Sequence, residues 1–139
     1  MTVALKEQID QGLIEVEQRD GKVFVTVGSG GAFPSGTADL TAEAQRIMDR
    51  IALTAMSPDS SITVTGHTDD VPISNGQFRD NWDLGAGRAA SVVQAIQNTG
   101  LISGDRLSAV SKGEMAPLAD NNTAAGREQN RRIEIEISY

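Results

Sequence analysis

The sequence predicts a small α/β (α+β) two-layer sandwich, with helices covering one face of a mixed β-sheet. Two observations support this fold class. Strand and helix patterns interleave along the chain after an opening hairpin pattern, which is typical of such a sandwich. The length of 139 residues favours one domain, which can bury roughly two-thirds of its unfolded surface and form a core without disulfides.

The chain opens with a polar segment that predicts a lead-in helix over about 3–11. Leu5 and Ile9 are four residues apart, so they can share one helix face. We expect residues 1–22 to form this helix and a first strand, and residues 23–139 to form the main domain. Because the helix pattern begins almost at once, we also expect the chain to be a piece of a longer protein.

Two strand patterns follow at 13–18 and 22–27, where apolar residues alternate or are β-branched. Asp20 and Gly21 lie between them. Both residues adopt positive φ readily, so the pair predicts a tight hairpin turn.

Residues 28–40 contain four glycines and a proline, which predicts a loop. We interpret this segment as a connector, slightly ahead of a second interpretation in which it forms a wall of a binding pocket. A phosphate-binding loop is excluded, because no Gly-Lys-Ser/Thr sequence follows the glycines.

A helix is predicted over 41–56, because its apolar residues recur with the spacing of one helix face. Asp39 or Thr41 can cap its start, and Pro58 ends it. The next pattern is a strand over 62–66, in which isoleucine and valine alternate with threonine.

A second helix is predicted from near Asp83 to Asn98, with Gly100 where a C-terminal glycine is expected. A short strand follows at 106–111, and then a polar loop with a brief helix. The chain closes with a strand over 132–138, where isoleucine alternates with charged or polar residues.

Composition narrows the function classes. The net charge of -7 and the pI near 4.6 argue against nucleic acid as a partner, because phosphate-backbone binders rely on clustered lysine and arginine. The absence of cysteine excludes disulfides, thiolate metal sites and catalysis by cysteine. No apolar run approaches the roughly 18 residues that indicate a membrane span.

Three residues at the start of the second helix suggest a binding site. Gly85 and Gly87 each cost about 1 kcal/mol relative to alanine in a helix, which favours close approach of another group to the backbone. A helix start also offers N–H groups to an anion. Arg88 lies on the second turn, where a cation is unfavourable for the helix dipole, and its guanidinium can bind both oxygens of a carboxylate or phosphate.

Asp69 and Asp70 follow the preceding strand, at the sheet edge where open α/β sheets bind ligands. Two interpretations of Asp69 have equal weight. It can form an internal salt bridge with Arg88 that fixes the loop. Alternatively, the pair stays open to a zwitterion, with Asp69 binding an ammonium group and Arg88 a carboxylate.

A metal-dependent hydrolase that uses His67, Asp69 and Asp70 is an alternative function. The chain has one histidine and no second histidine or glutamate at a recognisable spacing, so the ligand count argues against a metal. No nucleophile motif is present either. An enzyme is therefore the weaker class, and no cofactor is expected.

The remaining aromatic and basic residues near the site have simpler interpretations. Trp82 and Phe78 are assigned to packing. Arg127 and Arg131 precede the final strand and Arg132 begins it; the three form either an exposed basic face or a border of the same crevice.

Three segments, TGHTDDVPI, NWDLGAGRAASVV and NNTAAGREQNRRIEIEI, occur in this order. Together they resemble the OmpA-like peptidoglycan-binding domain, in the form found at the C-terminal end of MotB-type flagellar stator subunits. TDDVP followed by NWDL is closer to MotB and PomB than to OmpA or Pal, and the sodium-driven PomB type is the best match. The resemblance extends from about Val23 to the C-terminus.

The resemblance implies a non-catalytic domain that binds the diaminopimelate-containing stem peptide of peptidoglycan. Diaminopimelate carries an ammonium and a carboxylate on one carbon, which matches the pair Asp69 and Arg88. The family's TD motif, its LSxxRA motif and its NRR motif supply the expected binding positions. In this sequence they are Thr68, Asp69, Asn81, Leu84, Arg88, Asn130 and Arg131.

The resemblance further implies a periplasmic anchor that holds a flagellar motor stator to the cell wall during ion-driven motility. The full-length protein would be held in the inner membrane by a segment outside this chain. The implied partners are peptidoglycan, a second copy of the chain, a MotA/PomA-type membrane subunit and flagellar basal-body ring proteins. Wall binding is expected only after assembly at the motor, with the lead-in segment rearranging.

One position departs from the family pattern. Gly85 stands where the family usually has serine, so a hydroxyl that could cap the helix or touch the ligand is absent. This departure weakens the expectation of tight binding. A purely structural dimerisation module is a third possible function, because related domains pair through their sheets.

Overall fold

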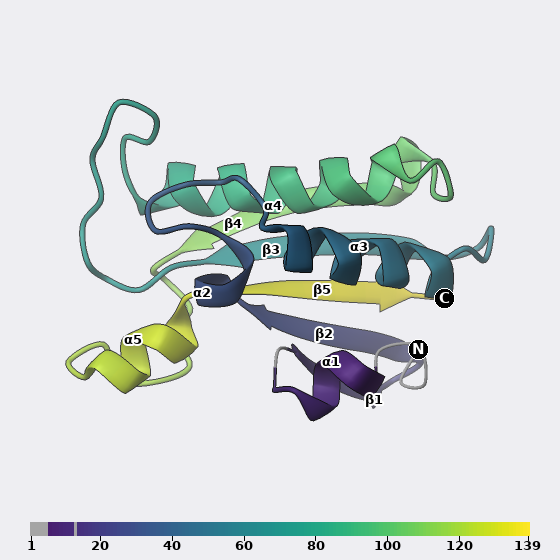
Figure 1. Cartoon of the computed structure of the whole chain (residues 1–139), viewed down its shortest axis with the longest axis horizontal. Coiled ribbons are helices and arrows are strands. Elements are labelled where there is room, and N and C mark those ends of the chain that lie inside the picture. Colours follow the sequence, from purple (N-terminus) through teal and green to yellow (C-terminus); the bar gives the residue numbers. More distant parts are fainter. Residues whose placement is uncertain (1–5, 13) are drawn as a thin grey trace.

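The computed structural model describes residues 6–12 and 14–139. One five-stranded sheet runs through the molecule, and α3 and α4 lie along the same face of it (Figure 1). The strands are β1 (Ile14–Arg19), β2 (Lys22–Gly28), β3 (Ser61–His67), β4 (Leu107–Gly113) and β5 (Arg132–Ser138). The helices are α1 (Lys6–Asp10), α2 (Ser29–Ala32), α3 (Ala42–Thr54), α4 (Asn81–Asn98), the 3-10 helix η1 (Gly104–Arg106) and α5 (Ala124–Asn130).

The sheet is mixed, with strand order β1-β2-β5-β3-β4. β3 and β4 are parallel, and α4 makes the crossover between them. The other neighbouring pairs are antiparallel. The predicted sandwich of helices on one face of a mixed sheet is therefore confirmed.

The core lies between the sheet and helices α3 and α4. Alternate side chains of β2 and β5 point toward these helices, as expected for the two-residue period of a strand, and the intervening residues point to the other face. The fully buried core side chains include Val25, Met48, Ile51, Ile62, Val64, Val92, Ile96, Ile133, Ile135 and Ile137.

Among the described helices, none is long and apolar enough to cross a membrane.

The structure confirms the predicted turn and caps at three places. The hairpin turn holds Asp20 at φ 55° and Gly21 at φ 74°. The side chain of Thr41 caps α3 by accepting a hydrogen bond from Ala44 N at 3.2 Å. Gly100 has φ 76° just after α4. Residues 1–5 and 13, which the predicted lead-in helix and first strand include, lie outside the described part of the chain.

The start of α4 differs from the prediction. The helix begins at Asn81 rather than near Asp83, because the Asp80 side chain caps it by accepting a hydrogen bond from Asp83 N at 3.0 Å. Asp83 in turn binds Arg79 through a 2.7 Å contact, and this bond lowers the pKa of Asp83 to about 2. Two carboxylates of the chain itself therefore lie at the positive end of α4.

The helix glycines have a packing role. A Cβ on Gly66 of β3 would lie 2.1 Å from the carbonyl oxygen of Gly85, and one on Gly85 would lie 2.5 Å from Ser111 Oγ. A Cβ on Gly87 would meet the Phe78 ring at 2.9 Å. These glycines let α4 lie directly on β3 and against the Phe78 loop, so the interpretation that they admit a ligand is wrong.

Candidate functional site

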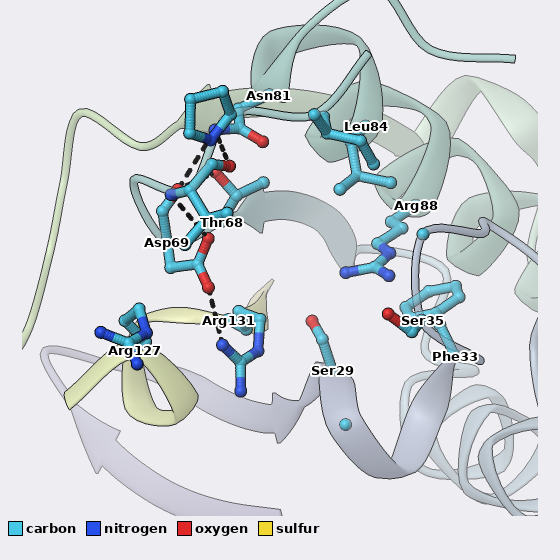
Figure 2. A pocket seen from close by; sticks show the side chains of 15 residues that line it. Ser29, Phe33, Ser35, Thr68, Asp69, Asn81, Leu84, Arg88, Arg127 and Arg131 are labelled. Atoms are coloured by element: carbon cyan, nitrogen blue, oxygen red, sulfur yellow. Dashed lines mark hydrogen bonds and ion pairs between the residues drawn. The ribbon is translucent and has the colours of Figure 1, made fainter. Parts of the chain in front are cut away.

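A pocket of about 580 Å³ lies at the end of the sheet where β3 ends and β5 begins. Its walls come from α2 and the loop after it, the loop after β3, the start of α4, and the C-terminal arginines. The glycine-rich segment 28–40 is therefore more than a connector: it forms one wall of the pocket, and the interpretation ranked second was the correct one. Side chains on this wall include Ser29, Phe33 and Ser35 (Figure 2).

Asp69 lies directly after β3 and is 8% exposed. One carboxylate oxygen accepts a hydrogen bond from the backbone of Val71 at 3.1 Å, which fixes the loop. The other pairs with Arg131 Nη1 at 2.6 Å. The internal salt bridge considered for Asp69 therefore exists, but its partner is Arg131 and not Arg88.

Arg88 faces Asp69 and Arg131 across the pocket (Figure 2). The residue is 4% exposed. Its Nε donates to the carbonyl of Thr37 at 2.8 Å, and its guanidinium carbon lies 4.9 Å from the centre of the Phe33 ring, within cation–π range. These contacts fix the side chain, and its two terminal nitrogens have no hydrogen-bond partner among the described residues.

The pocket is positively charged in an otherwise acidic chain. Three arginines, Arg88, Arg127 and Arg131, line it against one carboxylate, Asp69. Burial, followed by the nearby charge of Arg131, lowers the pKa of Arg88, whereas Asp69 acts in the opposite direction. A guanidinium stays protonated at neutral pH, so this repulsion is relieved by an anion between the two arginines.

Three further predicted positions lie at the same pocket: Thr68, Asn81 and Leu84. The Asn81 side-chain amide donates to the carbonyls of Asp69 at 3.3 Å and Val71 at 3.1 Å. The backbone of Thr68 donates to Gly113 at 2.8 Å. These contacts hold the loop that carries Asp69 against α4 and β4.

Asn130 does not reach the pocket, which corrects the expectation from the NRR motif. It is fully buried, and its side-chain oxygen accepts hydrogen bonds from the backbones of Leu118 and Ala119 at 2.7 and 2.9 Å. Its amide nitrogen donates to Ala119 and Asn121. Asn130 therefore shapes the loop before α5.

Arg132 also lies away from the pocket, unlike its neighbour Arg131. It is 3% exposed, and its guanidinium donates to Glu134 at 2.7 Å and to the carbonyls of Asn130 and Ala116. Of the three arginines considered for the crevice, Arg127 and Arg131 border it and Arg132 does not.

The ion-pair partner of His67 is Glu134 of β5. Its Nε2 lies 3.2 Å from Glu134 Oε1, although neither ring nitrogen has a well-aligned hydrogen bond within the described residues. His67 and then Arg132 lower the pKa of Glu134 to about 2, against the effect of burial. Across the described residues, no three potential metal ligands converge, so the arrangement does not favour the hydrolase alternative.

The two aromatic residues near the site behave differently. Phe78 is 6% exposed and packs with Ala38 and Leu84, as predicted. Trp82 is 48% exposed and its ring lies beside Gly113 of β4, so its assignment to packing holds only in part. Successive helix residues point about 100° apart, which turns Trp82 away from its pocket-lining neighbour Asn81.

The sequence profile of the OmpA family matches residues 32–131. This stretch includes β3, α4 and α5, with Asp69 and Arg88 among the matched positions. The chain belongs to the OmpA family.

The similarity to individual relatives covers longer stretches of the chain. Motility protein B of Bacillus subtilis is 31% identical over 134 residues, which cover 96% of the chain and 51% of the relative. The peptidoglycan-binding protein ArfA of Mycobacterium tuberculosis is 33% identical over 108 residues, covering 77% of the chain and 32% of the relative. The chain thus spans about half or less of the length of these relatives.

A solved structure matches almost the whole chain. It is the cell wall anchor of the type VI secretion system of Pseudomonas aeruginosa, with a TM-score of 0.91 and 31% identity. The match covers 99% of this chain and 95% of that one, so β1 and α1 have counterparts as well.

Proposed function

We propose that this chain is a non-catalytic peptidoglycan-binding domain. In this proposal, Asp69 binds the ammonium and Arg88 the carboxylate at the zwitterionic end of diaminopimelate in the stem peptide. The observation that carries it is that one pocket holds the Asp69 carboxylate and the buried Arg88 guanidinium. The two terminal nitrogens of Arg88 have no hydrogen-bond partner among the described residues, whereas its Nε donates to Thr37. The name of the relative ArfA and the wall-anchor neighbour support the ligand class.

Arg131 is the partner of Asp69 when no ligand is bound. Its 2.6 Å pair with Asp69 keeps that carboxylate from being buried without a partner, which would be costly. The ammonium group of the ligand takes the place of Arg131 Nη1 beside the Asp69 carboxylate. Because Arg131 is on the more exposed side, with a side chain 37% accessible, it can turn toward the ligand carboxylate.

The proposed role in the cell is to anchor a flagellar stator to the wall. Support comes from the similarity to Motility protein B over 96% of the chain. The domain would act in the periplasm, and the complete protein would be held in the inner membrane and bind a MotA/PomA-type subunit. Pairing with a second copy, contact with basal-body ring proteins and membership of the PomB type belong to the same proposal.

Co-sedimentation with purified sacculi tests the binding site. Asp69→Ala and Arg88→Ala should each remove most of the bound protein, while circular dichroism shows that both variants remain folded. Arg46→Ala is a matched control, because Arg46 is an exposed arginine on α3 whose side chain is 66% accessible. Wild-type sedimentation of both site variants would refute the assignment.

A secretion-system anchor is a second candidate assembly, because the type VI anchor matches 99% of the chain. Deleting the gene in the source organism separates the two. Loss of swimming with normal secretion supports the stator, and the reverse result supports the secretion system. In either case, Arg88→Ala introduced at the native locus should reproduce the deletion, because both assemblies depend on wall binding.

A further inference from the structure

Ser29, the first residue of α2, has an unusual environment. The residue is 2% exposed, and its Oγ has no hydrogen-bond partner among the described residues. It lines the pocket, and Figure 2 shows its hydroxyl directed into the space between Arg131 and Arg88. A buried polar group without a partner is destabilising and rare in folded proteins.

Ser60 shows how this protein treats a buried serine with a structural role. It is 1% exposed. Its hydroxyl donates to the carbonyls of Ala55 and Ser57 at 2.6 and 2.8 Å and accepts from Arg106 at 3.0 Å. Ser29 has the same burial and none of these contacts, so its hydroxyl is not explained by folding.

The groups around Ser29 identify the missing partner. Arg88 has two terminal nitrogens without a described partner, and Arg131 uses one nitrogen for Asp69. The backbone N–H of Ser29 donates to the carbonyl of Arg131 at 2.9 Å, which places the two residues side by side. A hydroxyl donor beside two guanidinium groups is complementary to a carboxylate, which can accept several hydrogen bonds at once.

We propose that Ser29 is a fourth ligand-binding residue beside Asp69, Arg88 and Arg131, and that its hydroxyl donates a hydrogen bond to a ligand carboxylate held between Arg88 and Arg131. This inference rests on the proposed function, and it assigns the carboxylate end of diaminopimelate to the α2 side of the pocket. The Ser29 hydroxyl is enclosed when the pocket is empty. Movement of Arg131 from Asp69 toward the carboxylate opens access to it.

The position makes Ser29 a specificity residue. Lysine has the same carbon chain and ammonium as this end of diaminopimelate but lacks the carboxylate. A residue that contacts only the carboxylate therefore contributes to binding of the diaminopimelate peptide and not to binding of the lysine peptide.

Isothermal titration of the whole chain with two stem tripeptides, one ending in meso-diaminopimelate and one in lysine, tests this inference. Ser29→Ala should weaken binding of the diaminopimelate peptide by about tenfold, the usual effect of losing a hydrogen bond to a charged group. Any binding of the lysine peptide should be unchanged. The melting temperature should stay level or rise, because an unpaired buried hydroxyl has been removed.

Ser60→Ala is the matched control, expected to melt at a lower temperature and to bind the diaminopimelate peptide like wild type. If wild type and Ser29→Ala bind that peptide equally while Arg88→Ala does not, the inference fails and the proposed function stands. Equal weakening of both peptides, or a clear drop in the melting temperature of Ser29→Ala, also overturns it. Failure of the wild-type chain to bind either the peptide or sacculi overturns the proposed function and the inference together.

Discussion

Two charged clusters lie at the same end of the sheet, and they differ in how completely their hydrogen bonds are used. The far-face cluster consists of His67, Arg132 and Glu134. There, every guanidinium nitrogen of Arg132 donates a hydrogen bond within the protein. In the pocket, Arg88 is equally buried but makes one such bond among the described residues.

The difference shows that residue type alone does not mark a binding site. Arg131 and Arg132 are adjacent in the sequence, yet one borders the pocket and the other supports the sheet. The more useful indication is a side chain that is held in place but still has hydrogen-bond donors without a partner. It separates groups that await a ligand from groups whose partners are already in the fold.

Removing Arg132 should have the largest effect on stability. Arg132→Ala removes the hydrogen bonds to Glu134 and to the carbonyls of Asn130 and Ala116, so we expect a loss of about 2–3 kcal/mol in the free energy of unfolding. Urea denaturation measures it. Sacculus binding at low temperature should persist, and a variant as stable as wild type would contradict the structural role of the far-face cluster.

Changing Arg88 to lysine should affect binding more than stability. Lysine keeps the charge but loses the planar fork that can bind two carboxylate oxygens and the stacking on Phe33. We expect at least tenfold weaker binding of the diaminopimelate peptide, measured by calorimetry. If Arg88→Lys binds the peptide as tightly as wild type does, charge alone holds the carboxylate. The unused guanidinium nitrogens of Arg88 would then not distinguish it from Arg132.

Gly85 tests whether the start of α4 belongs to packing or to the pocket. Gly85→Ala places a Cβ against Ser111 Oγ, which currently donates to the Trp82 carbonyl at 2.9 Å. We expect a loss of about 1 kcal/mol in the free energy of unfolding, with ligand binding unchanged.

Ser111→Ala should relieve that contact. In a double-mutant cycle, the pair should be more stable than the two single effects predict, by about 1 kcal/mol. Additive effects would show that Ser111 is not what limits the size of residue 85. A fall in ligand affinity would show that Gly85 contributes to the binding site.

An effect similar in size to that of Gly85→Ala is expected for the pH dependence of the far-face cluster. The pKa of Glu134 is lowered from 4.5 to about 2, so its contribution is complete above pH 4.5 and is lost as the pH falls toward 2. Because its side chain is 40% exposed, we expect a contribution of about 1 kcal/mol. Glu134→Gln should flatten the stability profile between pH 4.5 and 2, and an unchanged profile would contradict the assignment.

Most of the fold could be predicted because its signals are local. Two-residue and helical periodicities located the strands and the two long helices, and Asp20-Gly21 located the hairpin turn. The limits of α4 were less certain, because the cap at Asp80 depends on a side-chain hydrogen bond rather than on hydrophobic spacing.

The site was only partly predictable because its details depend on contacts between distant parts of the chain. Asp69 and Arg88 could be recognised from motif and position, and the structure brings them to one pocket. The pairing of Asp69 with Arg131 spans 62 residues, and the proposed role of Ser29 rests on the lack of a hydrogen-bond partner for its hydroxyl among the described residues. The glycine-rich segment was the available signal for Ser29, since its alternative interpretation was a pocket wall.

The strand order has a consequence for biosynthesis. β5 is the last of the five strands to be made, yet it lies at the centre of the sheet between β2 and β3. The N-terminal hairpin and the β3-α4-β4 unit cannot join before β5 arrives, and Arg131 arrives only with it. A nascent or truncated chain that lacks β5 therefore has no assembled pocket, so the proposed binding site forms only once the last strand has been made.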